Sequence, residues 1–176
     1  MEKISYKNHE IEIWNDYDES YNDSEHLGTF YTSIPRHLNP DGHLLKELKD
    51  EDGLITDKDV VFILVNAYIH GGVALSTSDE WPFNDRWDGG LGGVMATTRE
   101  RAKEWLGRDA TDDEIRESLQ KDVDELDVFC QGEVYGFTIT DENGEIIESV
   151  GGYVGDENYC REEAKSFVDS YSEEQK

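Results

Sequence analysis

The apolar run from Val60 to Val65 is the feature that most constrains how this chain folds. It is long enough for a buried strand and too short to span a membrane. Two more apolar pieces, Val73 to Leu75 and Val94 to Ala96, enclose a segment dense in aromatic, acidic and glycine residues. Loops held between strands commonly carry function, so this segment is the first candidate for a functional site.

Three other parts of the chain have strand patterns. Residues 10–14 alternate polar and apolar, as a half-buried strand does. Residues 27–34 are rich in threonine and aromatic side chains, which indicates a short strand. Residues 133–140 and 145–150 enclose an Asn-Gly pair, which is favoured in tight hairpin turns, so we expect them to pair antiparallel.

Helical spacing of apolar residues occurs in four segments. The first covers residues 43–52, with Asp41 as a candidate N-cap. The second runs from Thr98 to Leu106, with Thr97 or Thr98 as a candidate N-cap, and has Ala102, Trp105 and Leu106 on its apolar side. The third is the longest. It begins at a capping box, Thr111 to Glu114, and carries a solvated acidic ridge opposite its apolar stripe. The fourth covers residues 158–171.

These elements predict an α+β fold. We expect an antiparallel sheet of about five strands with two or three helices packed on one face. The length fits one domain with one core over residues 1–176. An acidic loop at about residues 15–26 and a frayed tail at 172–176 complete this prediction.

Charge restricts the partners of this chain. The chain has 42 Asp and Glu residues and 16 Lys and Arg residues, which gives a formal net charge of −26. Such a chain repels nucleic acid and anionic membranes, and it attracts proteins whose own surface is basic. The alternative is that the acids only keep the protein soluble.

Two features predict a cytoplasmic protein. Cys130 and Cys160 fit reduced, partly buried thiols better than a disulfide framework. The first ten residues contain no apolar signal core. We therefore expect the protein to act in the cytoplasm of a bacterial host, without crossing a membrane.

Four pieces of the sequence resemble a family of small acidic proteins encoded by phages, plasmids and other mobile elements of bacteria. The pieces are HLGT at 26–29, YIHGGVALS at 68–76, WDGGLGGV at 87–94 and GEVYGF at 132–137. In relatives we expect Ser-Gly-Gln after the Trp-Asp pair, where this chain has Gly89-Gly90-Leu91. The resemblance implies a mobile-element accessory protein. Such genes often encode inhibitors of host defence, including antirestriction and anti-CRISPR proteins.

Acidic residues around tryptophans are the predicted partner-binding site. Tryptophan dominates binding hot spots, and surrounding carboxylates select a basic partner. The alternative is that these aromatics fill the end of the core. The predicted site has six residues on the loop and four on the helical ridge: Asp79, Glu80, Trp81, Asp85, Trp87, Asp88, Asp112, Asp113, Glu117 and Asp124.

A metal site is the enzymatic alternative. His70, Asp85 and Asp88 could hold Mg²⁺ or Ca²⁺, which prefer oxygen ligands, and so support cleavage of RNA or DNA. The sequence has no P-loop, no G-x-S-x-G and no C-x-x-C. We therefore favour a binding protein without a cofactor over an enzyme.

The preferred hypothesis is an acidic inhibitor that imitates nucleic acid in the basic groove of a host defence enzyme. The expected target is a CRISPR effector nuclease or a restriction enzyme, without direct contact to nucleic acid. A metal-dependent nuclease is the second hypothesis. An intracellular adaptor or homodimer, whose charge serves solubility only, is the third.

Overall fold

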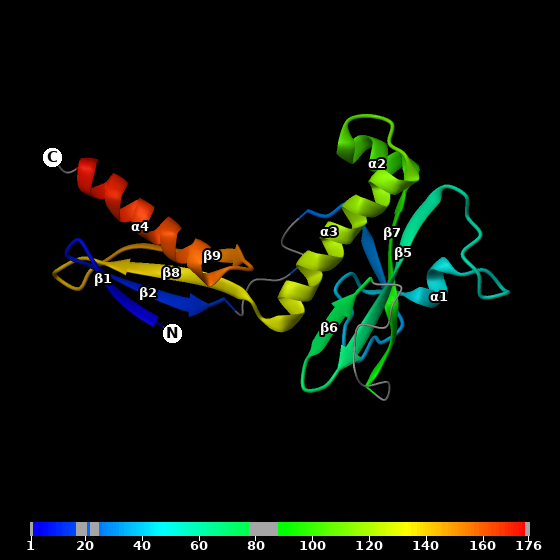
Figure 1. Ribbon diagram of the computed structural model, residues 1–176, viewed down its shortest axis with the longest axis horizontal. Helices are drawn as coiled ribbons and strands as arrows, with labels where there is room; N and C mark the ends of the chain where they lie inside the picture. The colour runs from blue at the N-terminus through cyan, green and yellow to red at the C-terminus, as the bar shows by residue number, and fades with distance from the viewer. Residues whose placement is uncertain (1, 17–20, 22–24, 78–87, 175–176) are drawn as a thin grey trace. The chain divides into compact units, whose positions relative to one another are not determined.

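The computed structural model describes residues 2–16, 21, 25–77 and 88–174 (Figure 1). The chain divides into two compact units, one made of residues 1–20 and 132–176 and the other of residues 21–131. We call them unit 1 and unit 2. The length of the chain suggests one core, but each unit has a hydrophobic core of its own. The fold is α+β, as predicted, with the strands distributed over two sheets.

Unit 1 is a four-stranded antiparallel sheet with one helix. The strand order is β1 (Glu2–Tyr6), β2 (His9–Asn15), β8 (Val134–Thr140) and β9 (Ile146–Val154). Helix α4 (Glu157–Glu174) packs on this sheet, and Cys160, Ala164 and Val168 meet Ile11 and Phe137 in the core. The predicted hairpin is confirmed, with Gly144 at φ 85° in its turn. The sequence patterns did not predict strand β1.

In its described residues, unit 2 has a five-stranded sheet and three helices. The strand order is β4 (His43–Leu44), β3 (Thr29–Thr32), β7 (Gly89–Thr98), β5 (Val60–Ile69) and β6 (Val73–Ser76). The helices are α1 (Leu45–Leu48), α2 (Arg99–Leu106) and α3 (Asp112–Gln131). All strand pairs are antiparallel except β3 with β4.

Apolar side chains on both faces of the second sheet explain its continuous apolar runs. On one face the apolar stripe of α3 packs against the sheet, and Leu119 and Val123 share a core cluster with Val65 and Met95. On the opposite face Val94 belongs to a second cluster of buried residues. A strand with apolar neighbours on both faces needs no polar alternation, and in the predicted strand from Val60 only Leu64 is exposed.

The first predicted helix is much shorter than residues 43–52. Only Leu45–Leu48 is helical, and the two residues before it form β4. No side chain caps this helix. Asp41 accepts a hydrogen bond from the backbone N–H of Phe30 at 2.6 Å instead. Asp50 fixes the following turn by accepting the N–H of Leu54 at 2.9 Å.

The two other predicted caps are confirmed. The Thr98 hydroxyl accepts the N–H of Arg101 at 3.2 Å at the start of α2. At the start of α3, the Thr111 hydroxyl accepts the N–H of Glu114 at 3.3 Å. The Glu114 carboxylate accepts the N–H of Thr111 at 2.8 Å in return, which completes a capping box. Arg108 also donates to Glu114 at 2.6 Å.

The capping box makes acid stability depend on Glu114. Hydrogen bonds from Arg108, and then from Thr111, lower the pKa of Glu114 to about 2, below the unfolded value of about 4.3. Its stabilisation is therefore present above pH ~4.3 and is lost as the pH falls toward 2. We expect the thermal midpoint of the wild type to exceed that of Glu114→Gln at pH 5. The difference between the two midpoints should shrink steadily as the pH falls from about 4.3 toward 2. A difference that does not vary with pH would contradict this.

The glycine-rich segment is part of a strand, and this corrects the expectation of a loop there. Gly89 to Gly93 form the first half of β7 and pair with β5. A Cβ on Gly92 would lie 2.7 Å from the Cβ of Ala67, and one on Gly93 would lie 2.5 Å from the carbonyl oxygen of Tyr31. Glycine is therefore required at these two positions because neighbouring strands come too close for a side chain.

Candidate functional site

The acidic loop predicted to bind a partner lies mostly outside the described residues. This applies to Asp79, Glu80, Trp81, Asp85 and Trp87. Asp88 is among the described residues and directly precedes β7.

Asp88 pairs with His70, and the two are separated by 3.0 Å between Oδ2 and Nδ1. Both side chains are exposed, at 37% and 73% respectively. The structure thus brings together two of the three residues proposed as metal ligands, and Asp85 lies outside the described part of the chain. Within that part, no group of three or more His, Cys, Asp or Glu side chains is arranged to hold a metal ion. The metal site stays a prediction.

Helix α3 presents the other predicted partner-binding residues in two different settings. Asp112 accepts hydrogen bonds from the Arg99 guanidinium, and this holds the pKa of Asp112 below its usual range. Asp113 lies 3.3 Å from Arg116 in an exposed ion pair. Among the described residues, neither Glu117 nor Asp124 has a Lys or Arg nitrogen within 4 Å. The negative charge of the ridge is therefore least compensated on its middle turns.

A groove lies between these middle turns of α3 and strand β5. We call it the α3 groove. Its volume is about 830 Å³. Its sheet side consists of Phe62, Ile63, Leu64 and Thr77, and its helix side of Asp113, Arg116, Glu117, Gln120, Lys121 and Asp124. Leu64 is 57% exposed. Three of the predicted partner-binding carboxylates thus line one groove that also has an apolar side.

The charge of α3 is lower than that of a DNA strand of the same length. Twenty helical residues span about 30 Å, over which one strand carries roughly nine phosphates. The helix has eight Asp and Glu against two Lys and Arg. Two of these acids face inward: Asp122 accepts the N–H of Gly28, and Asp127 accepts the N–H of Leu75. Helix α3 alone therefore matches less than half of the phosphate charge.

The net negative charge is shared equally between the two units. Unit 1 carries 18 Asp and Glu against 5 Lys and Arg, and unit 2 carries 24 against 11, so each has a formal charge of −13. The cations Lys3, Arg108 and Lys165 each lie within 2.7 Å of a carboxylate. A field of this kind attracts a basic partner over a distance, and short-range contacts must then select the surface that binds.

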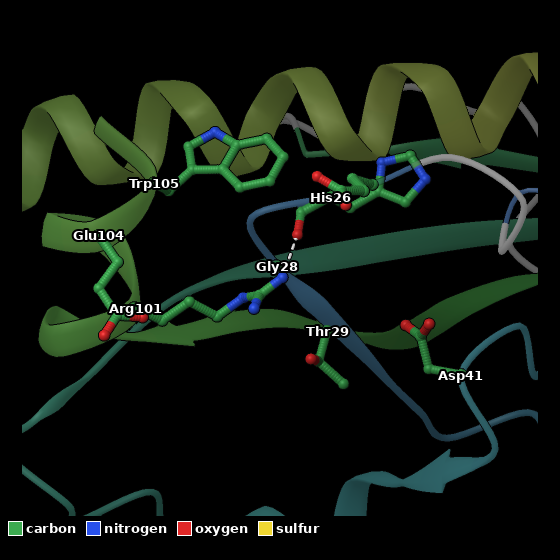
Figure 2. A pocket seen from close by; sticks show the side chains of 8 residues that line it. His26, Gly28, Thr29, Asp41, Arg101, Glu104 and Trp105 are labelled. Carbon is green, nitrogen blue, oxygen red and sulfur yellow. Dashed lines mark hydrogen bonds between the residues drawn. The ribbon is translucent and has the colours of Figure 1, made fainter. Parts of the chain in front are cut away.

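A second cavity lies at the segment HLGT, residues 26–29, and sequence reasoning did not find it. Its volume is about 510 Å³ (Figure 2). The lining residues come from three stretches of unit 2: Glu25, His26, Gly28, Thr29, Asp41, Arg101, Glu104 and Trp105. Trp105 was expected on the apolar side of its helix. It is 43% exposed, and the fully buried residue of that helix is Ala102.

Buried polar groups hold the HLGT segment in place. Asp122 on α3 is 9% exposed and accepts the Gly28 N–H at 2.7 Å. The His26 ring stacks on Tyr21 with 3.8 Å between ring centroids, and His26 Nε2 donates to the Tyr21 carbonyl oxygen at 2.8 Å. Burial raises the pKa of Asp122 although the Gly28 N–H and His26 act in the other direction.

The two cysteines do not offer an activated nucleophile. Burial, and then the charge of Asp127, raise the pKa of Cys130 to about 12. Burial, and then Glu157, raise the pKa of Cys160 to about 11. Because the thiolate is the reactive form, both thiols stay protonated and unreactive at neutral pH. Both are free, and they belong to different units.

Comparison with known proteins adds no relative to these observations. No protein-family model, curated protein or solved structure matches the chain. The described residues contain no helix that is both long enough and apolar enough to cross a membrane.

Proposed function

We propose that this protein binds a basic surface of a host nucleic-acid-handling defence enzyme through the α3 groove and thereby inhibits it. The target class is a CRISPR effector nuclease or a restriction enzyme, in line with the family resemblance. The observation that carries the proposal is the α3 groove itself, where Glu117 and Asp124 line the same groove as Ile63, which packs on the α3 side of the sheet. Carboxylates next to an apolar surface suit a segment that carries both basic and apolar side chains.

Two further features support this proposal. The charge of −13 on each unit would speed the encounter with a basic protein and make it depend on ionic strength. Strand β5 pairs with β6 only from Asn66 onward, and no described strand pairs with residues 60–65 on that side. Such an edge can accept an extended segment by main-chain hydrogen bonds. The contact then resembles strand addition more than imitation of a complete nucleic-acid backbone.

Charge reversal in the α3 groove is the direct test. We expect the double variant Glu117→Lys, Asp124→Lys to inhibit DNA cleavage by the target nuclease at least about tenfold more weakly, since two favourable charges become repulsive. The readout is the inhibitor concentration that halves cleavage of a labelled DNA. The matched control is Glu142→Lys, Glu145→Lys at the exposed hairpin turn of unit 1, with the same change in net charge.

The control pair separates local contact from overall charge. If inhibition depends on net charge alone, both double variants lose it equally, and the α3 groove has no special role. If the proposal holds, the hairpin variant retains most of its inhibition at 150 mM salt, where long-range attraction is largely screened.

A further inference from the structure

The cavity at residues 26–29 contains a guanidinium that is fixed by backbone groups. Arg101 Nε donates to the carbonyl oxygen of Leu27 at 2.9 Å, and Nη2 donates to that of His26 at 2.5 Å. An arginine has five N–H donors, so these two bonds hold the group in place and leave three donors. Carbonyl partners leave the positive charge uncompensated.

Carboxylates line the same cavity without reaching this guanidinium. Asp41, Glu25 and Glu104 are all lining residues, and no described carboxylate oxygen lies within 4 Å of the Arg101 nitrogens. Figure 2 shows Arg101 and Asp41 on opposite sides of Thr29. Asp41 is fixed by the Phe30 N–H through one oxygen, which leaves its second oxygen for another donor. The cavity therefore separates a positive end from a negative end.

The distance between the two ends can be bounded from their backbone partners. Arg101 contacts the carbonyl of Leu27 and Asp41 contacts the N–H of Phe30, three residues further along the chain. Three residues span at most about 10 Å and the hydrogen bond at each end adds about 3 Å, so the two charged groups lie at most about 16 Å apart. An amino-acid zwitterion has about 3 Å between its carboxylate and ammonium groups, and a hydrogen bond of about 2.9 Å at each end brings the span to roughly 9 Å.

We propose that this cavity binds a free α-amino acid with an apolar side chain. Its carboxylate accepts hydrogen bonds from the remaining donors of Arg101, and its ammonium donates to Asp41. The side chain lies against the Trp105 ring, which extends from α2 toward the centre of the cavity (Figure 2). A volume of about 510 Å³ is within the range of small-molecule sites. The cavity shares no lining residue with the α3 groove, so this proposal does not rest on the proposed function.

Titration calorimetry of the wild-type protein with L-leucine and L-phenylalanine tests the proposal. We expect a dissociation constant below about 1 mM for at least one of them. N-acetyl-L-leucine lacks the ammonium and L-leucinamide lacks the carboxylate, so each should bind at least about tenfold more weakly than L-leucine. Equal binding of either analogue, or no heat with both amino acids at about 10 mM, would overturn the proposal.

Three variants test whether the binding lies in the cavity. Arg101→Gln should weaken L-leucine binding at least about tenfold, since the donors to the carboxylate are lost. Lys103→Gln removes the same charge from an exposed position of the same helix and should leave binding unchanged. Trp105→Phe keeps an aromatic ring in the cavity and should still bind L-leucine. The change in tryptophan fluorescence that L-leucine causes in the wild type should disappear in this variant. Equal affinity in Arg101→Gln and Lys103→Gln would place the binding elsewhere.

Discussion

Gly93→Ala is expected to destabilise unit 2 by about 1–3 kcal/mol, with a matching fall in the urea midpoint. An added Cβ would lie 2.5 Å from the Tyr31 carbonyl oxygen and 2.8 Å from the Phe30 ring. The carbonyl belongs to strand β3, which pairs with β7 at this point. Phe30 is fully buried in the core. Because neither neighbour can move freely, β3 and β7 must separate locally.

Gly90→Ala is the matched control for this prediction. It lies in the same strand, and a Cβ there would meet no atom within 4 Å. Alanine also restricts the unfolded chain, so this variant should be neutral or more stable by up to about 1 kcal/mol. Hydrogen exchange should show lost protection in β3 and β7 of Gly93→Ala, with the sheet of unit 1 unchanged. Equal urea midpoints for the two variants would show that the close approach at Gly93 does not affect the free energy of unfolding.

Local patterns in the sequence predict the elements with long periodic runs. The apolar stripe and capping box predict α3 within a residue of its observed start, since both signals are local. The hairpin β8–β9 and helix α4 follow from equally local signals. The distribution of strands over two sheets is a long-range choice: β2 pairs with β8, more than a hundred residues later. Local sequence patterns cannot predict such long-range strand pairings.

The two cavities show the same limit for function. The acidic side of the α3 groove follows from helical periodicity, but its apolar side requires the pairing of β5. The cavity at residues 26–29 combines Asp41 and Arg101, which are 60 positions apart in the chain. Trp105 was predicted on the apolar side of its helix, and its exposure could not be predicted because spacing alone cannot show how much of an eight-residue helix the sheet covers. The HLGT motif was the one local sign of this site.

Asp122→Ala is expected to cost about 2–3 kcal/mol of stability at pH 7, and Asp122→Asn clearly less. The side chain is 9% exposed, and its carboxylate accepts the buried Gly28 N–H at 2.7 Å. Alanine leaves that donor without a partner, whereas the asparagine carbonyl oxygen can still accept the bond. A Cβ on Gly28 would lie 2.7 Å from Leu119 and Met95, so the segment has no room to shift toward another acceptor.

The pH dependence of the asparagine variant identifies the cause. Burial raises the pKa of Asp122 above its unfolded value of about 3.9, against the opposing influence of the Gly28 N–H and His26. The folded state therefore binds the proton more tightly, and ionising Asp122 lowers stability as the pH rises from about 4 through the folded pKa. Asparagine has no such titration. The stability of the wild type relative to Asp122→Asn, measured from urea midpoints, should therefore decrease over this range. If the relative stability of the wild type increases over this range, the attraction between His26 and the Asp122 carboxylate outweighs the desolvation of that carboxylate.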